Sequence, residues 1–226
     1  MSTFTFVRSA GVADASPLTS TATLTPASIT AGDLVIASLS CAQGPTSLDS
    51  VTDSLGNLYD PCSDAFFWTI PGPFTLIQRA FRTIAIAGGS NPVMTAHFTG
   101  TTIGNFTFNA DEYSMTGTVG RVGVRGESHA TGNNAGPANS GSVIVDGNTL
   151  LFGWFNATNF TSTPPAGWTN RSGVNIDIAD DLNVAAGTYS YQPSWVGGAQ
   201  NWVAQILAFG DVNPPYVNIY PPMLAQ

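Results

Sequence analysis

Residues 105–110 read Asn-Phe-Thr-Phe-Asn-Ala, an alternation that places Phe106 and Phe108 on one side and the polar residues on the other. The same period of two returns near the end of the chain, over residues 202–208. A period of two is the pattern of a β-strand, and helical periodicity is almost absent from the chain. Clusters of Gly, Pro, Asn and Ser separate the short runs of β-forming residues. We therefore predict an all-β protein.

Two of the predicted strands contain nearly continuous apolar runs, Leu34–Leu39 and Leu150–Phe155, which is typical of central strands covered on both faces. Many short strands with frequent turn signals predict a sandwich or barrel, and we expect a jelly-roll sandwich of two antiparallel sheets. The predicted strands are Phe4–Arg8, Asp33–Cys41, Leu48–Thr52, Asn57–Asp60, Phe74–Ile86, Pro92–Phe98, Asn105–Ser114, Ser142–Asp146, Thr149–Ala157, Gly187–Tyr191 and Gln200–Phe209.

Charged residues make up only 9% of the chain, the net charge is −8, and all six basic residues are arginines. Without a basic run to neutralise phosphates, binding to nucleic acid is disfavoured, and so is a polybasic membrane anchor. No segment approaches the ~18 uninterrupted apolar residues of a membrane span. Residues 1–8 lack the pattern of a secretory signal, so we expect synthesis in a cytoplasm. Cys41 and Cys62 should then be reduced, although a bridge stays the alternative in an oxidising compartment.

The chain contains two related halves, at about residues 31–116 and 142–210. Each half opens with a turn and an apolar strand, and each closes with an alanine-rich turn followed by an alternating strand. The opening units are residues 31–37 and 146–152, and the closing units are residues 85–108 and 184–206. Residues 118–141, rich in Gly and Asn, are interpreted as a long crossing connection. We expect the two halves to supply interleaved strands to one domain spanning residues 1–210.

The sharpest local motif is Val51–Tyr59, which reads Val-Thr-Asp-Ser-Leu-Gly-Asn-Leu-Tyr. Asp53 is placed to accept from the turn backbone, and Gly56 to supply a positive φ, so the motif predicts a hairpin with a type I turn and a bulge. The functional alternative is a calcium loop using Asp53, Asn57 and Asp60. That spacing lacks the dense ladder of carboxylates typical of calcium sites.

Asp111 and Glu112 are adjacent carboxylates, as a glycosidase would use in a pair. Neighbours on a strand point to opposite faces, so these two do not flank one glycosidic bond. Glu112 has the parity of Phe106 and Phe108, which predicts a position at the margin of the core, paired with an arginine. We expect no enzymatic activity.

The two histidines, His97 and His129, lie in no metal-binding frame. A Ser/His/Asp triad stays an alternative, although the chain has no Gly-x-Ser-x-Gly elbow. Asp177, Asp180 and Asp181 are interpreted as an acidic loop, with calcium binding as the lesser alternative. We predict no catalytic residues, no metal site and no cofactor.

Two aromatic residues in predicted loops, Trp168 and Trp195, are candidates for a sugar-stacking platform, with packing in the core as the favoured alternative. Residues 211–226 contain two Pro-Pro pairs and predict an extended arm. Because the arm is apolar, we expect it to be held by a partner or to fold back along its own sandwich. Its candidate partner-binding residues are Tyr216, Ile219, Tyr220, Met223 and Leu224.

Four segments together resemble a β-sandwich family of tailed-bacteriophage virion proteins: Gly32–Ile36, Val51–Tyr59, Glu112–Ser114 and Trp202–Ala204. The resemblance spans roughly residues 31–210 and implies a capsid decoration, head-fibre or tail-fibre protein. Because long fibre repeats are missing, we expect a decoration or cement protein on the outer capsid surface. Its partners would be the major capsid protein or further copies of the chain in a homo-oligomer. The alternative is a carbohydrate-binding module used for host attachment.

Overall fold

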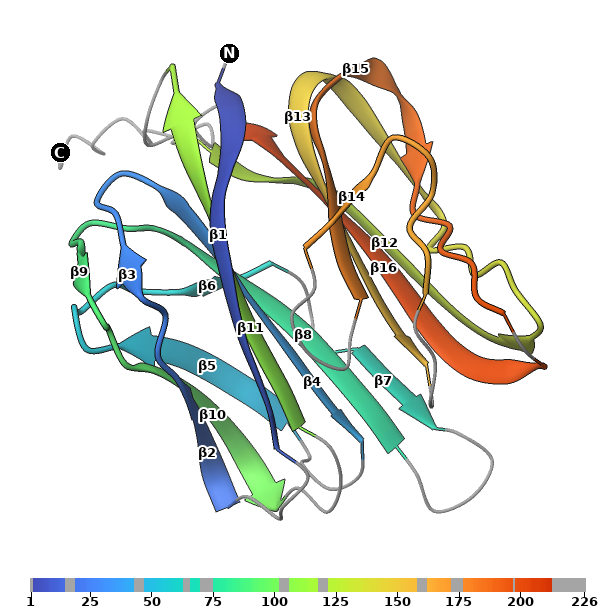
Figure 1. Cartoon of the computed structure of the whole chain (residues 1–226), viewed down its shortest axis with the longest axis horizontal. Helices are drawn as coiled ribbons and strands as arrows, with labels where there is room; N and C mark the ends of the chain where they lie inside the picture. The colour runs from blue at the N-terminus through green and yellow to red at the C-terminus, as the bar shows by residue number, and fades with distance from the viewer. Residues whose placement is uncertain are drawn as a thin grey trace, which may run out of the picture.

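The computed structural model of the chain describes residues 2–14, 19–42, 47–62, 66–69, 75–101, 106–117, 122–157, 162–171, 177–196 and 198–212. These residues form sixteen strands, all of whose pairings are antiparallel, and none of them is in an α-helix (Figure 1). The predicted all-β sandwich is confirmed, while the jelly-roll winding stays a prediction. No helix in this part of the chain is long and apolar enough to cross a membrane.

The first half of the chain contains eleven strands and the second half contains five. Those of the first half are β1 (Thr3–Asp14), β2 (Thr19–Leu24), β3 (Ser28–Ile29), β4 (Leu34–Ala42), β5 (Ser47–Asp53), β6 (Asp60–Pro61), β7 (Phe66–Thr69), β8 (Thr75–Ile84), β9 (Gly89–Ser90), β10 (Met94–Thr101) and β11 (Phe106–Thr116). Those of the second half are β12 (Val122–Asn134), β13 (Ser142–Ala157), β14 (Thr169–Asn170), β15 (Asp177–Ser190) and β16 (Gln200–Asp211).

Three sheets make up most of the molecule. The central sheet has the order β1-β11-β4-β8-β6, with β7 also paired to β8. The outer sheet has the order β2-β10-β5, and the C-terminal sheet has the order β12-β16-β13-β15-β14. The strands β3 and β9 form a separate two-stranded ribbon. In Figure 1 the central and outer sheets lie on the left, and the C-terminal sheet lies beside them on the right.

The central and C-terminal sheets share one plan. In each sheet, the first strand of the half (β1 or β12) lies at the edge and pairs with the last strand of that half (β11 or β16). Two inner strands follow (β4 and β8, or β13 and β15), and then a two-residue strand (β6 or β14). Each half nevertheless builds its own sheets, because no sheet formed by the described residues combines strands from both halves. The predicted interleaving of the two halves is therefore wrong.

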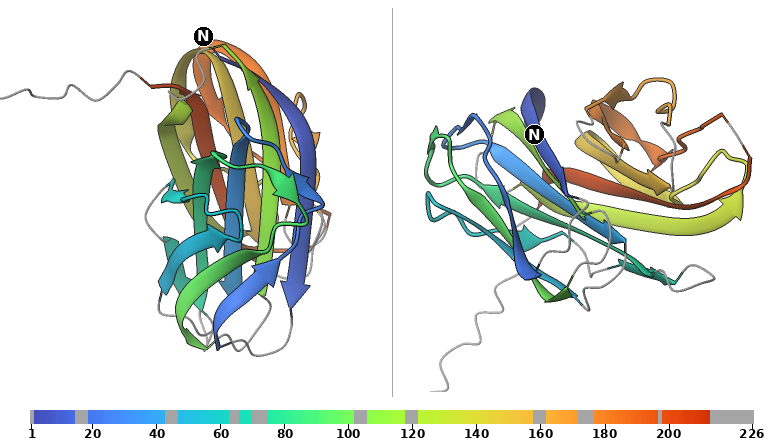
Figure 2. Two further views of the ribbon diagram at one scale, coloured as in Figure 1. Left: turned by 90° about the vertical axis from the view of Figure 1, so that its left-hand side faces the viewer. Right: turned by 60° about the horizontal axis from the view of Figure 1, so that its bottom comes forward.

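Three apolar clusters hold the layers together. The first fills the space between the outer and central sheets, and the second joins the central sheet to the C-terminal sheet. The third covers the other face of the C-terminal sheet. On β4, Val35 belongs to the first cluster and Ile36 to the second, while on β13, Phe152 belongs to the second and Leu151 to the third. This confirms that the two apolar runs are central strands. The right panel of Figure 2 shows the layers of the first half beside the C-terminal sheet.

Two segments interpreted as loops are strands. Residues 118–141 contain the thirteen-residue strand β12, so they are no simple connection, and the halves are wider than 31–116 and 142–210. Its Gly, Ser, Ala and Asn content resembles that of a loop, and only pairing with β16 makes it a strand. The acidic segment at Asp177–Asp181 is the start of β15, where Asp177 and Asp180 are buried.

The C-terminal boundary of the sandwich lies beyond residue 210. Asp211 pairs with Val122 in the sheet, and its carboxylate accepts bonds from the backbone nitrogen and the hydroxyl of Ser2 at 2.9 and 2.6 Å. Val212 packs over Gly123. A Cβ atom added to Gly123 would lie 3.0 Å from the Cγ1 atom of Val212. The predicted arm at 211–226 therefore loses its first two residues to the sandwich. Residues 213–226 lie outside the described part of the chain.

Candidate functional site

Asp111 and Glu112 on β11 point to opposite faces of the central sheet. Glu112 lies on the face with Phe106 and Phe108, toward the outer sheet, while Asp111 shares the face of Tyr113, toward the C-terminal sheet. Both side chains are buried, with exposed fractions of 3% for Glu112 and 0% for Asp111. Two separate acidic clusters follow from this alternation.

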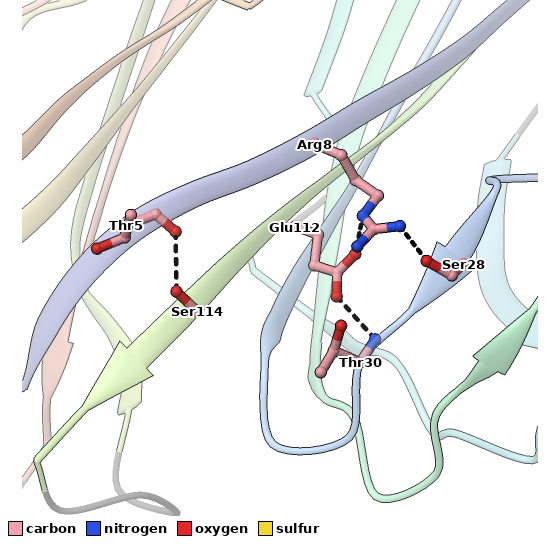
Figure 3. Close-up of polar contacts among 6 residues, drawn as sticks. All are labelled: Thr5, Arg8, Ser28, Thr30, Glu112 and Ser114. Carbon is pink, nitrogen blue, oxygen red and sulfur yellow. Dashed lines mark hydrogen bonds and ion pairs between the residues drawn. The ribbon is translucent and has the colours of Figure 1, made fainter.

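The first is the turn cluster, which consists of Arg8, Asp33 and Glu112. Arg8 and Glu112 are paired in register between β1 and β11, and their Nε and Oε2 atoms lie 2.9 Å apart. The other Glu112 oxygen accepts from the backbone nitrogen of Thr30 at 2.7 Å, and Arg8 also donates to the hydroxyl of Ser28 (Figure 3). The predicted pairing of Glu112 with an arginine is confirmed. The cluster fastens the turn before β4 to the central sheet.

Asp33 completes the turn cluster as a second carboxyl group beside Glu112. Burial, together with the hydrogen bond and the charge of Glu112, raises the pKa of Asp33 to about 6, while the charge of Arg8 opposes this shift. The backbone of Asp33 is also fixed, because its nitrogen donates to the Thr30 carbonyl at 3.2 Å and its carbonyl accepts from Ala85 at 2.9 Å. This carboxyl pair supports a turn and is closed to a large substrate.

The second is the inter-sheet cluster, which consists of Asp111, Arg171 and Asp180. It joins β11 of the central sheet to β15 and the segment before it. Arg171 Nε lies 2.8 Å from Asp180 Oδ2, and its guanidinium lies over the ring of Phe6, 3.9 Å from the centroid. Burial raises the pKa of Tyr113, and the nearby charges of Asp111 and Asp180 raise it further. Residues from both halves thus meet between the two sheets.

Asp111 differs from the other carboxylates of these clusters because neither of its oxygens has a hydrogen-bond partner among the described residues. Burial and the charge of Asp180 raise the pKa of Asp111 to about 7, against the opposing effects of the nearby Ser9 hydroxyl and the charge of Arg171. With both carboxylates ionised, the cluster holds two negative charges and one positive charge. One negative charge is left without compensation in the interior, which is a costly arrangement.

Three further polar contacts tie the halves together. Asn156 Nδ2 donates to Ser40 Oγ at 2.8 Å, between β13 and β4. The Asn183 side chain accepts from the Phe4 nitrogen at 2.7 Å and donates to the Phe4 carbonyl at 2.9 Å. Together with the contact between Ser2 and Asp211, these bonds fix the orientation of the C-terminal sheet on the central sheet.

The Val51–Tyr59 motif forms the predicted turn. Asp53 Oδ1 accepts from the backbone nitrogens of Leu55 and Asn57, both at 3.0 Å, and Gly56 has a φ of 84°. Asp53 Oδ2 accepts from Asn57 Nδ2 at 2.8 Å and from the Tyr59 hydroxyl at 3.1 Å. Four donors therefore occupy the carboxylate that the calcium alternative required. Within the described ranges, no three His, Cys, Asp or Glu residues gather as a metal site.

The histidines and cysteines are all separated from one another. His97 Nε2 lies 3.0 Å from the Thr52 hydroxyl in the outer sheet, and His129 Nδ1 lies 3.4 Å from Glu127 in the C-terminal sheet. Cys41 and Cys62 are not joined by a disulfide, and they are buried in different apolar clusters. Burial raises the pKa of both thiols to about 12, so neither is a ready nucleophile.

The two candidate sugar-stacking tryptophans have different environments. Trp195 is a core residue with an exposed fraction of 8%, and its ring is stacked on Phe155 with centroids 5.4 Å apart. Its segment folds over the outer face of the C-terminal sheet, so Trp195 does not form the predicted platform. Trp168 is half-buried and packs against Tyr191, with ring centroids 4.8 Å apart. The candidate arm residues Tyr216, Ile219, Tyr220, Met223 and Leu224 lie outside the described residues.

The contribution of Arg171 and Asp180 to the inter-sheet cluster was missed by sequence reasoning. The only available signal was the period of two in Asp-Ile-Ala-Asp at 177–180, which places Ile178 and Asp180 on one face. No family model, no curated protein and no solved structure matches this chain. The resemblance to phage virion proteins therefore stays an expectation from sequence.

Proposed function

We propose that the protein is a structural component of a tailed-phage virion, decorating the outer surface of the capsid. The observation that carries the proposal is the use of its paired carboxylates inside the sandwich. Asp33, Asp111, Glu112 and Asp180 have exposed fractions of 7%, 0%, 3% and 1%, and they bind turns and sheets of the chain itself. Such an arrangement favours a structural role over hydrolysis of a glycan or peptide.

The arginines support an outer rather than a DNA-facing position. Arg8, Arg125 and Arg171 form ion pairs with Glu112, Asp146 and Asp180, which reduces the positive charge available to a phosphate backbone. The net charge of −8 adds repulsion from DNA.

The chain ends with an apolar, proline-rich segment that follows β16 directly, and we assign it the role of assembly element. Stiff proline-rich segments lose little conformational freedom on docking. Each fully buried side chain of this kind contributes about 1.5–3 kcal/mol to association. The experiment compares the full chain with a chain ending at Val212, which keeps the contacts of Asp211 and Val212. The shortened protein should unfold at the same temperature and lose its binding to purified capsids of the phage that encodes it.

Two variants make this test specific. Tyr216→Ala with Tyr220→Ala should reduce capsid binding, whereas Val196→Ala, which changes a side chain that is 94% exposed on the sandwich, should leave it intact. Undiminished binding of the shortened chain would remove the arm from the proposal. Cryo-electron microscopy that finds no density for the sandwich on the capsid lattice would overturn the decoration role itself.

A carbohydrate-binding module is the second candidate, and it rests on Trp168 alone. This residue keeps part of its ring accessible beside Tyr191. Trp168→Ala should abolish the tryptophan fluorescence change on adding host-surface glycans if the protein binds sugars. No change with the wild-type protein, at any glycan concentration, would exclude this candidate.

A further inference from the structure

Several buried side chains between the central and C-terminal sheets have polar atoms with no hydrogen-bond partner among the described residues. Five residues supply them, each with an exposed fraction of 0% or 1%. The atoms are Ser38 Oγ, both amide atoms of Asn109, both carboxylate oxygens of Asp111, Trp154 Nε1 and Asp180 Oδ1. Buried polar groups are nearly always paired with protein, water or an ion. These five residues therefore leave buried polar atoms unbonded between the two sheets.

Strand register places the members from the central sheet next to one another. Asn109 lies directly opposite Ser38 in the pairing of β11 with β4. Asp111 lies two residues further along β11, on the same face as Asn109. Ser40 lies two residues from Ser38 on β4, and its hydroxyl accepts the bond from Asn156. Ser38 and Asn109 thus lie between Asp111 and the Ser40 contact.

The C-terminal sheet repeats this spacing from the other side. Asp180 on β15 lies opposite Phe152 on the neighbouring strand β13, and Asn156 lies four residues further along β13. Trp154 lies between Phe152 and Asn156 on the same face of β13. Asn156 bonds to Ser40, and the partners of Asp111 and Asp180 in their sheets, Ile36 and Phe152, pack in the same apolar cluster, so the two sheets stack with their rows aligned. Trp154 consequently faces Ser38, and the unpartnered atoms of both sheets lie between the same two contacts.

The charge of this location identifies its ligand. Asp111 and Asp180 supply two negative charges and Arg171 one positive charge, so a single positive charge is needed for neutrality. A proton on Asp111 would balance the charge, but it would supply a single donor for several unbonded oxygens, which include those of Asn109, Ser38 and Asp180. A metal ion can be coordinated by all of these oxygens at once. A divalent ion would leave an excess positive charge in the interior, which a monovalent ion avoids.

We infer that the protein binds one monovalent cation of the Na⁺ or K⁺ class between its two halves, through oxygens of Asp111, Asp180, Asn109 and Ser38. Ordered waters complete the shell of the ion and accept from the donor groups of Trp154 and Asn109. The ion holds the C-terminal sheet on the central sheet, at the end of the interface where the apolar cluster gives way to polar side chains. This inference is independent of the proposed function.

The test uses the full chain, unfolded and refolded in NaCl, KCl or choline chloride at equal ionic strength and mildly alkaline pH. Choline is too large for the site and serves as the inert cation. Binding to the folded state alone raises the melting temperature, and we expect an increase of about 5 °C or more in one of the two alkali salts. Asp111→Asn should abolish the increase. The control Asp33→Asn, which alters the turn cluster, should retain it.

Equal melting temperatures in choline and both alkali salts would overturn the inference and leave a proton or water alone at the site. A rise produced by CaCl2 but by neither alkali salt would overturn the monovalent class. If Asp111→Asn fails to fold, wild-type crystals grown in RbCl provide the second measurement. An anomalous rubidium peak between Asp111 and Asp180 supports the site, and a flat map there overturns it.

Discussion

The turn cluster and the inter-sheet cluster each combine one arginine with two carboxyl groups, yet their hydrogen bonding differs. In the turn cluster, Glu112 is held by Arg8 on one oxygen and by the Thr30 nitrogen on the other. In the inter-sheet cluster, Arg171 binds Asp180, and Asp111 has no bonded partner among the described residues. The same composition therefore serves a local turn in one place and leaves capacity for a ligand in the other.

The origin of each cluster explains this difference. Arg8 and Glu112 are direct neighbours within one sheet, so sheet pairing itself brings the two charges together. Asp111 and Asp180 come from two sheets that meet through an apolar cluster, and side-chain packing there leaves no freedom to adjust the polar atoms. Register pairing brings Arg8 and Glu112 into an ion pair within one sheet, whereas contact between the sheets bonds polar side chains at particular pairs such as Asn156 and Ser40.

The largest effect is expected for Arg171→Met, which removes the only arginine from the inter-sheet cluster. Two buried carboxylates would then face each other without compensation, because Asp180 is 1% and Asp111 0% exposed. Breaking a buried ion pair in this way costs about 3–5 kcal/mol. Urea unfolding in choline chloride at mildly alkaline pH measures the loss. Arg171→Lys, as the control, should recover part of it, and a loss below about 1 kcal/mol for Arg171→Met contradicts the picture.

Arg8→Met tests the turn cluster in the same way and should cost less, about 2 kcal/mol. The Arg8 side chain is 34% exposed, so water screens part of its interaction, and Glu112 keeps its bond from Thr30. Urea unfolding of both arginine variants in one buffer gives the comparison. A loss for Arg8→Met that equals or exceeds the loss for Arg171→Met would show that the two clusters do not differ as described.

Sequence patterns predicted the parts of the fold that depend on neighbouring residues. The two apolar runs identified β4 and β13 as strands covered on both faces. Alternation on β11 predicted that Asp111 and Glu112 face opposite ways and that Glu112 meets an arginine. The composition of the Asp53 turn predicted its side-chain to backbone bonds. All of these follow from periodicity or from contacts a few residues apart.

The parts that were missed depend on partners far along the chain. The strand β12 has a loop-like composition and is a strand only through its pairing with β16, more than sixty residues later. Asp180 looked like part of a solvated loop because nothing near it indicates that Arg171 and Tyr113 enclose it. Local sequence also does not specify whether two halves interleave or stack, since both arrangements bury the same apolar faces.

The turn cluster should also carry a pH dependence that Asp33→Asn removes. Burial and the neighbouring Glu112 together raise the pKa of Asp33 from its ordinary value of 3.8 to about 6. The folded state thus holds this proton more tightly than the unfolded chain, and the free energy of unfolding falls as the pH rises from 3.8 to about 6. The stability of Asp33→Asn relative to wild type should rise by about 1–2 kcal/mol over that window. Asp111 titrates in both proteins and cancels in the difference.

Urea unfolding at a series of pH values measures this difference between the two proteins. Above the window Asp33 is ionised in both the folded and the unfolded wild-type protein, and the difference should stay level. A difference that is already constant below the window, or that falls with rising pH, would contradict the sign of the Asp33 shift.

The smallest effects compare one serine from each cluster region. Ser28 Oγ accepts a hydrogen bond from Arg8, so Ser28→Ala should cost about 1 kcal/mol. Ser38 Oγ is buried with no bonded partner among the described residues, so in choline chloride Ser38→Ala should change stability by less than about 0.5 kcal/mol or increase it. The unfolding free energies of both variants are measured against wild type by urea titration. In the alkali salt that stabilises the wild-type protein, Ser38→Ala should instead lose stability, because it removes one oxygen from the ion. If Ser38→Ala changes the unfolding free energy by the same amount in both salts, Ser38 is not a ligand of the cation. If Ser28→Ala is destabilised in the same experiment, the contrast between the two clusters is kept.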